Sequence, residues 1–153
     1  MEKKLYLAYG SNLNIPQMAR RCPTARIYGT AEISNYELLY KGSKTGAYLT
    51  IEIKKGGKVP VAVWEVTPAD ERNLDMYEGF PNFYYKKNIK VNVKTIDGKT
   101  KKTEAFVYIM HEDRKLAEPS IHYVRCCEEG YRSFKFDLKY LNKAYERSVK
   151  DES

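Results

Sequence analysis

The sequence predicts an α+β domain built on a curved or closed β-sheet. Strand-like segments follow one another through most of the chain, helical patterns are few, and one apolar helical stripe lies near the C-terminus. The length of 153 residues suits a single domain, 1–153, and no linker, repeat or low-complexity tract divides it. Apolar residues make up 42% and charged residues 31%, which is typical of a folded domain and not of a disordered segment.

Seven segments have the composition of β-strands. They are apolar runs or alternate between apolar and polar residues, and turn residues bound them. Their ranges are 5–9, 26–34, 36–41, 47–53, 59–66, 84–96 and 103–110. Gly56-Gly57 and Asp97-Gly98 each predict a tight hairpin turn between two of these segments, and a loop is expected around Gly42 and Gly46.

Helices are predicted where a capping residue precedes a helical pattern. Asn14 caps the first helix, Thr67 and Asp70 resemble a capping box for the second, and Ser120 caps the third, which stops at Gly130. A fourth follows from apolar residues spaced four, three and four apart. The expected ranges are 14–21, 67–77, 120–130 and 134–145.

The charge of the chain raises the question of anionic partners. The net charge of +7 comes from 27 basic and 20 acidic residues, and the basic ones are 19 Lys against 8 Arg. Much of the excess positive charge lies in the 86–102 hairpin. We expect these lysines to form a solvated face that blocks edge-to-edge pairing of strands, rather than a surface that binds nucleic acid. No nucleic-acid partner is expected. No apolar run approaches the roughly 20 residues of a membrane helix, so we expect a cytoplasmic protein without a membrane partner.

Cysteine and histidine offer no metal site. The three cysteines, Cys22, Cys126 and Cys127, fit neither a disulfide framework nor a zinc-binding spacing. His111 and His122 form no HxxxH pattern. We therefore expect reduced, buried thiols and no metal.

The segment Tyr9-Gly10-Ser11-Asn12 lies where an apolar strand ends and a helix is about to begin. Glycine permits unusual backbone angles, and successive amides in such a loop can form a concavity that binds a carboxylate or an oxyanion. The alternative is an ordinary strand-to-helix turn, in which Ser11 and Asn12 serve as local caps.

A second candidate is Glu78, at the predicted end of the second helix among the aromatic residues of segment 77–85. The negative end of the helix dipole and burial among rings would both raise the pKa of its carboxyl. Such a group could take up and release a proton near neutral pH. The alternative is a solvent-facing carboxylate beside the glycine that ends the helix.

Both segments belong to a series of motifs that runs through nearly the whole chain in one order. These motifs are 8–14, Gln17-Met18, Arg21-Cys22-Pro23, 63–68, 74–81, 108–110, Pro119-Ser120 with Tyr123, Gly130-Tyr131, Phe136-Asp137 and Tyr140-Leu141. Together they resemble the γ-glutamylcyclotransferase-like (AIG2-like) family. The most specific part of the resemblance is the YGSN loop combined with the Glu of LDMYEGFP.

The resemblance implies a small mixed β-barrel with surrounding helices, and an enzyme that releases 5-oxoproline and a free amine from a γ-glutamyl amide. The expected reaction is intramolecular aminolysis, with Glu78 as general acid and base and without any metal or organic cofactor. A catalytically silent small-molecule binding module of the same fold is the alternative.

The substrate-binding residues that the resemblance implies are Tyr6, Leu7, Ala8, Tyr9, Gly10, Ser11, Asn12, Tyr108 and Tyr123. The chain departs from the family pattern at Phe134-Lys135-Phe136, where bacterial relatives usually carry Gly between the two apolar residues. That difference concerns the shape of the loop after Gly130 and, through it, the substrate.

Overall fold

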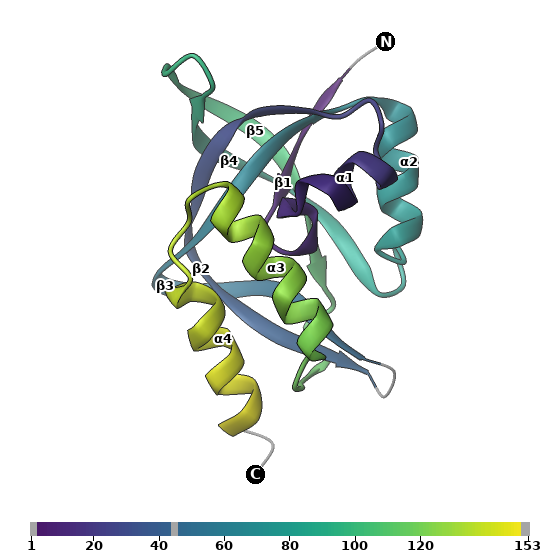
Figure 1. The fold of residues 1–153 in the computed structure, drawn as a ribbon, viewed down its shortest axis with the longest axis vertical. Coiled ribbons are helices and arrows are strands. Elements are labelled where there is room, and N and C mark those ends of the chain that lie inside the picture. The colour runs from purple at the N-terminus through teal and green to yellow at the C-terminus, as the bar shows by residue number, and fades with distance from the viewer. Residues whose placement is uncertain (1–2, 44–45, 151–153) are drawn as a thin grey trace.

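Five strands close into a barrel in the computed structural model, which describes residues 3–43 and 46–150 (Figure 1). The strands are β1 (Lys4–Ala8), β2 (Arg26–Ser43), β3 (Gly46–Val66), β4 (Tyr84–Thr95) and β5 (Thr100–Met110). They pair in the order β3-β1-β5-β4-β2, and β2 pairs again with β3 to close the circle. The β1–β5 pair is parallel and the other pairs of the barrel are antiparallel, so the predicted small mixed barrel is confirmed. A short strand, β6 (Lys115–Leu116), adds to β2.

The prediction of seven separate strands is wrong in the first half of the chain. Segments 26–34 and 36–41 form the single strand β2, and segments 47–53 and 59–66 form the single strand β3. Gly56-Gly57 makes no hairpin turn, because it belongs to a β-bulge of β3, in which residues 54–57 lie opposite the single residue Asn35 of β2. Asn35 Oδ1 accepts a hydrogen bond from the Gly56 N–H at 3.1 Å. The strands instead connect at residues 44–45, outside the described residues. The turn at Asp97-Gly98 is confirmed between β4 and β5.

Four α-helices surround the described barrel, with a 3₁₀ turn, η1 (Ser11–Leu13), after β1. They are α1 (Ile15–Arg21), α2 (Pro68–Tyr77), α3 (Ile121–Ser133) and α4 (Lys139–Lys150). The predicted caps are confirmed: Asn14 accepts from the Gln17 N–H, Ser120 accepts from the Tyr123 N–H, and Thr67 forms a capping box with Asp70. Figure 1 shows α3 across one side of the barrel, with α1 and α2 together beside it.

The third helix does not stop at Gly130 as predicted. It continues to Ser133, and Gly130 packs directly against Leu13 of η1. A Cβ atom at Gly130 would lie 2.6 Å from the carbonyl carbon of Leu13, so only glycine lets α3 pack this closely. The fourth helix begins at Lys139, later than predicted, because Phe134 is the C-cap of α3.

The backbone conformation accounts for Lys135, which stands where the family pattern has glycine. Lys135 adopts a left-handed conformation with φ of 60°. Its N–H donates to the Arg132 carbonyl and the Phe136 N–H donates to the Tyr131 carbonyl at 2.8 Å, which is the Schellman pattern of a helix end. Lysine therefore occupies a position that favours glycine, and the loop keeps the shape that glycine would give it.

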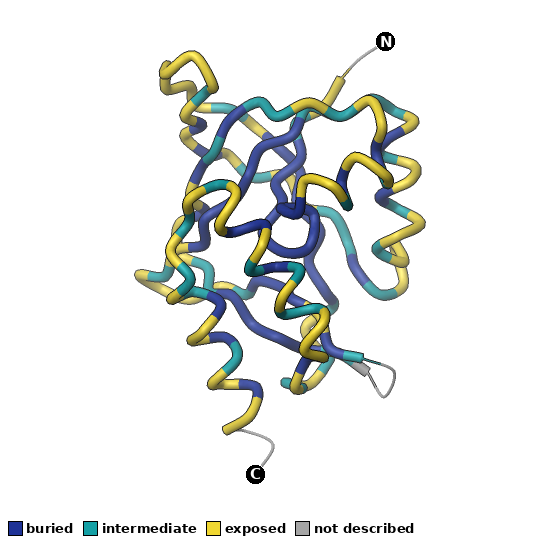
Figure 2. Tube along the Cα trace, in the orientation of Figure 1, coloured by how far each residue is buried: buried dark blue, intermediate teal, exposed yellow. Residues whose placement is uncertain are grey.

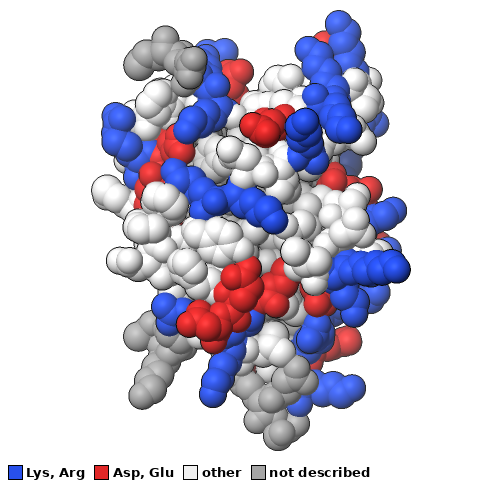
Figure 3. All heavy atoms as spheres, turned by 180° about the vertical axis from the view of Figure 1, so that it is seen from behind, with Lys and Arg blue, Asp and Glu red and all other residues white. Residues whose placement is uncertain are grey.

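Burial is concentrated in β1, in the inward-facing stretches of the other barrel strands and in the η1 loop, where the tube in Figure 2 is dark blue. Leu7, Val63 and Val107 are fully buried inside, and each such side chain contributes about 1.5–3 kcal/mol to folding. Figure 3 shows Lys and Arg side chains gathered at the upper right, over the β4–β5 hairpin, where the exposed lysines include Lys99, Lys101 and Lys102. Among the described helices, none has the length and apolar character needed to cross a membrane.

Candidate active site

A cavity of about 240 Å³ brings the two predicted segments together. Side chains from the barrel, from the η1 loop, from α3 and from the end of α2 surround it. They are Tyr6, Tyr9, Gly10, Ser11, Asn12, Tyr48, Leu49, Tyr77, Glu78, Phe83, Tyr84, Tyr108 and Tyr123. Glu78 therefore faces the same space as the Tyr9–Asn12 loop, Tyr108 and Tyr123.

The loop after β1 is tightly built. The Leu13 N–H donates to the Gly10 carbonyl and the Asn14 N–H donates to the Ser11 carbonyl, both at 3.0 Å. The first N–H groups of a helix have no partner within it, and here they belong to Ser11 and Asn12, which are both buried. The loop is thus a strand-to-helix turn that also borders the cavity, so the two interpretations of this motif are compatible.

Gly10 lies where a side chain would reduce the space beside the cavity. A Cβ atom there would be 3.3 Å from the Tyr123 hydroxyl and 3.4 Å from Leu49 Cδ1. The Tyr123 hydroxyl accepts a hydrogen bond from the Leu49 N–H at 3.1 Å, which fixes it next to the loop. The α3 helix thereby contributes to the site through Tyr123.

Several tyrosine hydroxyls of the cavity donate to other protein groups. Tyr9 donates to the Tyr108 carbonyl (2.7 Å), Tyr84 to the Leu49 carbonyl (2.8 Å) and Tyr108 to Asp75 Oδ1 (2.6 Å). These bonds hold the aromatic walls in place. Burial raises the pKa of each of these hydroxyls, so they stay neutral.

Tyr6 differs from these tyrosines, because its hydroxyl accepts a hydrogen bond from Asn12 Nδ2 at 2.9 Å. Within the described part of the chain, no acceptor takes the Tyr6 O–H proton. Burial raises the pKa of Tyr6, so this proton stays in place and can be donated to a ligand in the cavity.

Glu78 is the C-cap of α2, and its N–H donates to the Leu74 carbonyl at 2.8 Å. Burial of the carboxyl in the cavity raises its pKa to about 8, and the positive charge of Arg21 partly opposes this rise. No donor among the described residues forms a hydrogen bond with this carboxyl. Glu78 can therefore accept a proton from a ligand and return it near neutral pH, as predicted from its aromatic surroundings.

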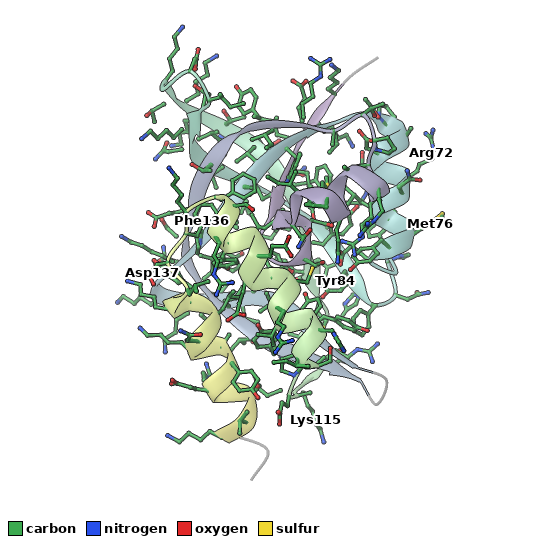
Figure 4. The ribbon with its side chains drawn as sticks, viewed as in Figure 1. Arg72, Met76, Tyr84, Lys115, Phe136 and Asp137 are labelled. Atoms are coloured by element: carbon green, nitrogen blue, oxygen red, sulfur yellow. The ribbon has the colours of Figure 1, made fainter. Side chains whose placement is uncertain are left out.

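The end of α2 is anchored so that Glu78 faces inward. Leu74 is fully buried, and Asp75 pairs with Lys86 of β4 at 2.9 Å. Figure 4 shows Arg72 and Met76 projecting outward from the other face of α2. These contacts of α2 fix the direction in which its C-cap residue, Glu78, points.

The predicted substrate-binding residues divide into two groups. Leu7 and Ala8 do not line the cavity, because both are buried in the barrel core. The others line it, although their roles stay predictions. Sequence reasoning missed Tyr48 and Leu49, which carry no local motif and line the cavity from the start of β3.

None of the three cysteine thiols has the properties of a catalytic nucleophile. Cys22 and Cys127 are buried and Cys126 is half-buried. Burial raises the pKa of all three, to about 12 for Cys22, so none is activated as a thiolate.

Comparison with known proteins agrees with this geometry. The family model described as gamma-glutamyl cyclotransferase, AIG2-like, matches residues 6–125. The chain is 30% identical to the gamma-glutamylcyclotransferase of Homo sapiens over 149 residues, which cover 93% of this chain and 77% of the human protein, and the Bos taurus protein matches equally. A solved gamma-glutamyl cyclotransferase superposes with a TM-score of 0.77 at 28% identity, covering 94% of this chain and 86% of that one. YkqA of Bacillus subtilis shares the fold, with a TM-score of 0.77 at 15% identity over 97% of this chain and 55% of its own.

Proposed function

Because the chain belongs to the AIG2-like gamma-glutamyl cyclotransferase family, we propose that it releases 5-oxoproline and a free amine from a γ-glutamyl amide. The α-amine of the substrate attacks its own γ-carbonyl, a five-membered lactam closes, and the original amide C–N bond breaks. One observation carries the proposal: the Glu78 carboxyl, which has no hydrogen-bond partner among the residues that the structure describes, lies in the same cavity as the Tyr9–Asn12 loop.

Glu78 handles the protons of this reaction. A free α-amine has a pKa of about 7.7–8.0, so most of it is protonated at neutral pH and cannot attack. The pKa of Glu78, about 8, matches that of the amine, and the proton can move between them at little cost in free energy. Glu78 then gives the proton to the departing nitrogen. No step requires a metal or an organic cofactor.

The other residues of the cavity hold the substrate in its folded-over form. Nucleophile and electrophile belong to one molecule, so the main task of the site is to select the conformer in which they meet. The N–H groups of Ser11 and Asn12 and the hydroxyl of Tyr6 are donors that can hold the γ-glutamyl group and support negative charge on the carbonyl oxygen.

The direct test is incubation with γ-glutamyl amides whose leaving groups differ: an amino acid, the ε-amine of lysine and a polyamine. Chromatography should detect 5-oxoproline and free amine in equal amounts from at least one of them. Binding of such amides without any 5-oxoproline above the level of Glu78→Gln would identify the chain as a silent binding module instead.

A further inference from the structure

Arg21 joins the two halves of the site without lining the cavity. Its Nη1 donates to Ser11 Oγ at 3.3 Å and to Asn12 Oδ1, and its Nη2 donates to Gln17 Oε1 at 2.7 Å. The guanidinium lies over the Tyr77 ring at 3.5 Å from its centre. One side chain of α1 thus holds the substrate loop and the last residue of α2.

The backbone of Arg21 is tied to the same helix. Its carbonyl accepts a hydrogen bond from Asn73 Nδ2 of α2 at 2.9 Å. Among the described residues, no carboxylate lies within ion-pair distance of the guanidinium, and all its described hydrogen-bond partners are neutral. The positive charge is therefore not neutralised by a neighbouring acid.

Arg21 also fixes the direction of the hydrogen bonds that lead to the cavity. A guanidinium can only donate, so the Asn12 side chain must present its oxygen to Arg21. Asn12 must then present its NH₂ group to the Tyr6 oxygen, which leaves the Tyr6 O–H proton for the cavity. Without Arg21 the Asn12 amide could rotate and take up that proton itself.

The charge of Arg21 acts on Glu78 in surroundings that are otherwise neutral. Tyr48 of β3 also borders the cavity, and Asp75, which accepts from the Tyr108 hydroxyl, pairs with Lys86. The other titratable groups that face Glu78, from β1, its following loop, α2, β4, β5 and α3, are the hydroxyls of Tyr6, Tyr9, Tyr77, Tyr84, Tyr108 and Tyr123. Burial raises the pKa of all these hydroxyls, so they carry no charge near neutral pH. In the described chain, Arg21 is the charged side chain whose field favours the carboxylate form of Glu78.

We propose that Arg21 is a positioning residue, which fixes the Ser11–Asn12 loop against Tyr77, directs the Tyr6 proton into the cavity and favours Glu78 as a proton acceptor. The catalytic part of this inference rests on the proposed function. Arg21 acts on the substrate through these neighbours and does not touch the reacting atoms.

Two substitutions of Arg21 separate the effect of its positive charge from the effect of its hydrogen-bonding geometry. Arg21→Gln removes the charge, and Arg21→Lys keeps it but loses the planar fork and the stacking on Tyr77. Arg20→Gln is the matched control, because Arg20 is the exposed neighbour in the same helical turn. With Arg21→Gln the acid limb of the kcat/KM profile should move to higher pH. With Arg21→Lys this limb should stay near that of the parent while KM rises about tenfold, the loss expected for hydrogen bonds from a charged donor.

A measurement without substrate separates this inference from the proposed function. The Glu78 carboxyl can be titrated by ¹³C NMR of glutamate-labelled protein, with Glu78→Gln to assign its signal. The Glu78 titration should move to higher pH in Arg21→Gln and stay unchanged in Arg20→Gln. Identical titrations in the parent and in Arg21→Gln would overturn the inference, even if the parent is an active enzyme.

The other possible outcomes of these experiments also test either the proposed function or the role of Arg21. A parent that forms no 5-oxoproline from any γ-glutamyl amide would refute the proposed function, while the titration would still test Arg21. An Arg21→Gln variant that loses activity but keeps the parental acid limb would show a merely structural role and overturn the inference. Should Arg21→Gln fail to fold, Arg21→Lys carries the test, and a parental KM in that variant would contradict it.

Discussion

Gly10 and Glu78 border the same cavity although 67 residues lie between them in the chain. The β1–β3 register accounts for this proximity. β3 runs antiparallel to β1 and ends at Val66, opposite Lys4 at the far end of β1. The ten residues of α2 then run back over about 15 Å, close to the length of the five-residue strand β1, and return the chain to the level of the loop.

The buried carboxyl of Glu78 should make the protein less stable as pH rises. In the folded protein its pKa is about 8, against an ordinary value of 4.5. Between these values unfolding releases a proton, so the stabilising contribution of the protonated form is complete below about pH 4.5 and is lost as pH rises through 8. Glu78→Gln should match the parent in stability at low pH and exceed it at pH 8.5 by roughly 2–4 kcal/mol.

Thermal melts at several pH values check this expectation. The melting temperature of Glu78→Gln should exceed that of the parent by at least about 4 °C at pH 8.5. Glu129→Gln, at an exposed position in α3, is the control and should follow the parent at every pH. A constant difference between the Glu78→Gln and parent curves at all pH values would show that Glu78 is not buried in its neutral form.

Gly130→Ala tests the contact between α3 and the loop. Alanine favours a helix over glycine by about 1 kcal/mol, but the new Cβ would meet Leu13 at 2.6 Å and the Asn14 nitrogen at 2.7 Å. The clash involves backbone atoms that cannot rotate away, so we expect a net destabilisation of roughly 1–3 kcal/mol and weaker substrate binding. Urea denaturation measures the first effect, and Glu129→Ala, at an exposed site of the same helix, serves as the control. A Gly130→Ala protein more stable than the parent would disprove the close packing.

Lys135→Gly should stabilise the protein or leave its stability unchanged. Relief of the left-handed strain at Lys135 is worth about 1–2 kcal/mol, and the greater freedom of glycine in the unfolded chain offsets part of it. Lys143→Gly, in the middle of α4 and also exposed, should instead cost about 1 kcal/mol. Equal losses of unfolding free energy in the two variants would mean that Lys135 does not hold the left-handed conformation.

Local chemistry decided which parts of this fold could be predicted from the sequence. The caps Asn14, Thr67 and Ser120 and the Asp97-Gly98 turn depend on neighbouring residues, and all were predicted. Gly56-Gly57 has the same composition as a turn, but it forms a bulge of β3 opposite Asn35, a pairing that depends on the distant strand β2. A glycine that ends a helix and one that permits close helix packing also look alike in the sequence.

In the candidate site, too, features that depend on neighbouring residues could be predicted, and features that depend on distant elements could not. Glu78 and the Tyr9–Asn12 loop carry recognisable motifs, and their location on one cavity followed from the resemblance. Tyr48 and Leu49 join them from the start of β3, for which the sequence has no local signal. Arg21 belongs to one of the motifs of the resemblance, but its hydrogen bonds to Ser11 and Asn12 depend on how α1 packs and carry no signal in the sequence.

The rate of 5-oxoproline release by Glu78→Gln tests the central claim most directly. Glutamine keeps the volume of the side chain and removes the proton acceptor, and general acid–base catalysis is worth about 10²–10⁴ in rate. With a γ-glutamyl amide that the parent turns over, release should fall by at least that range, while affinity measured by calorimetry stays within roughly tenfold. Release at the parental rate would contradict the assignment of Glu78 as the acid and base of the reaction.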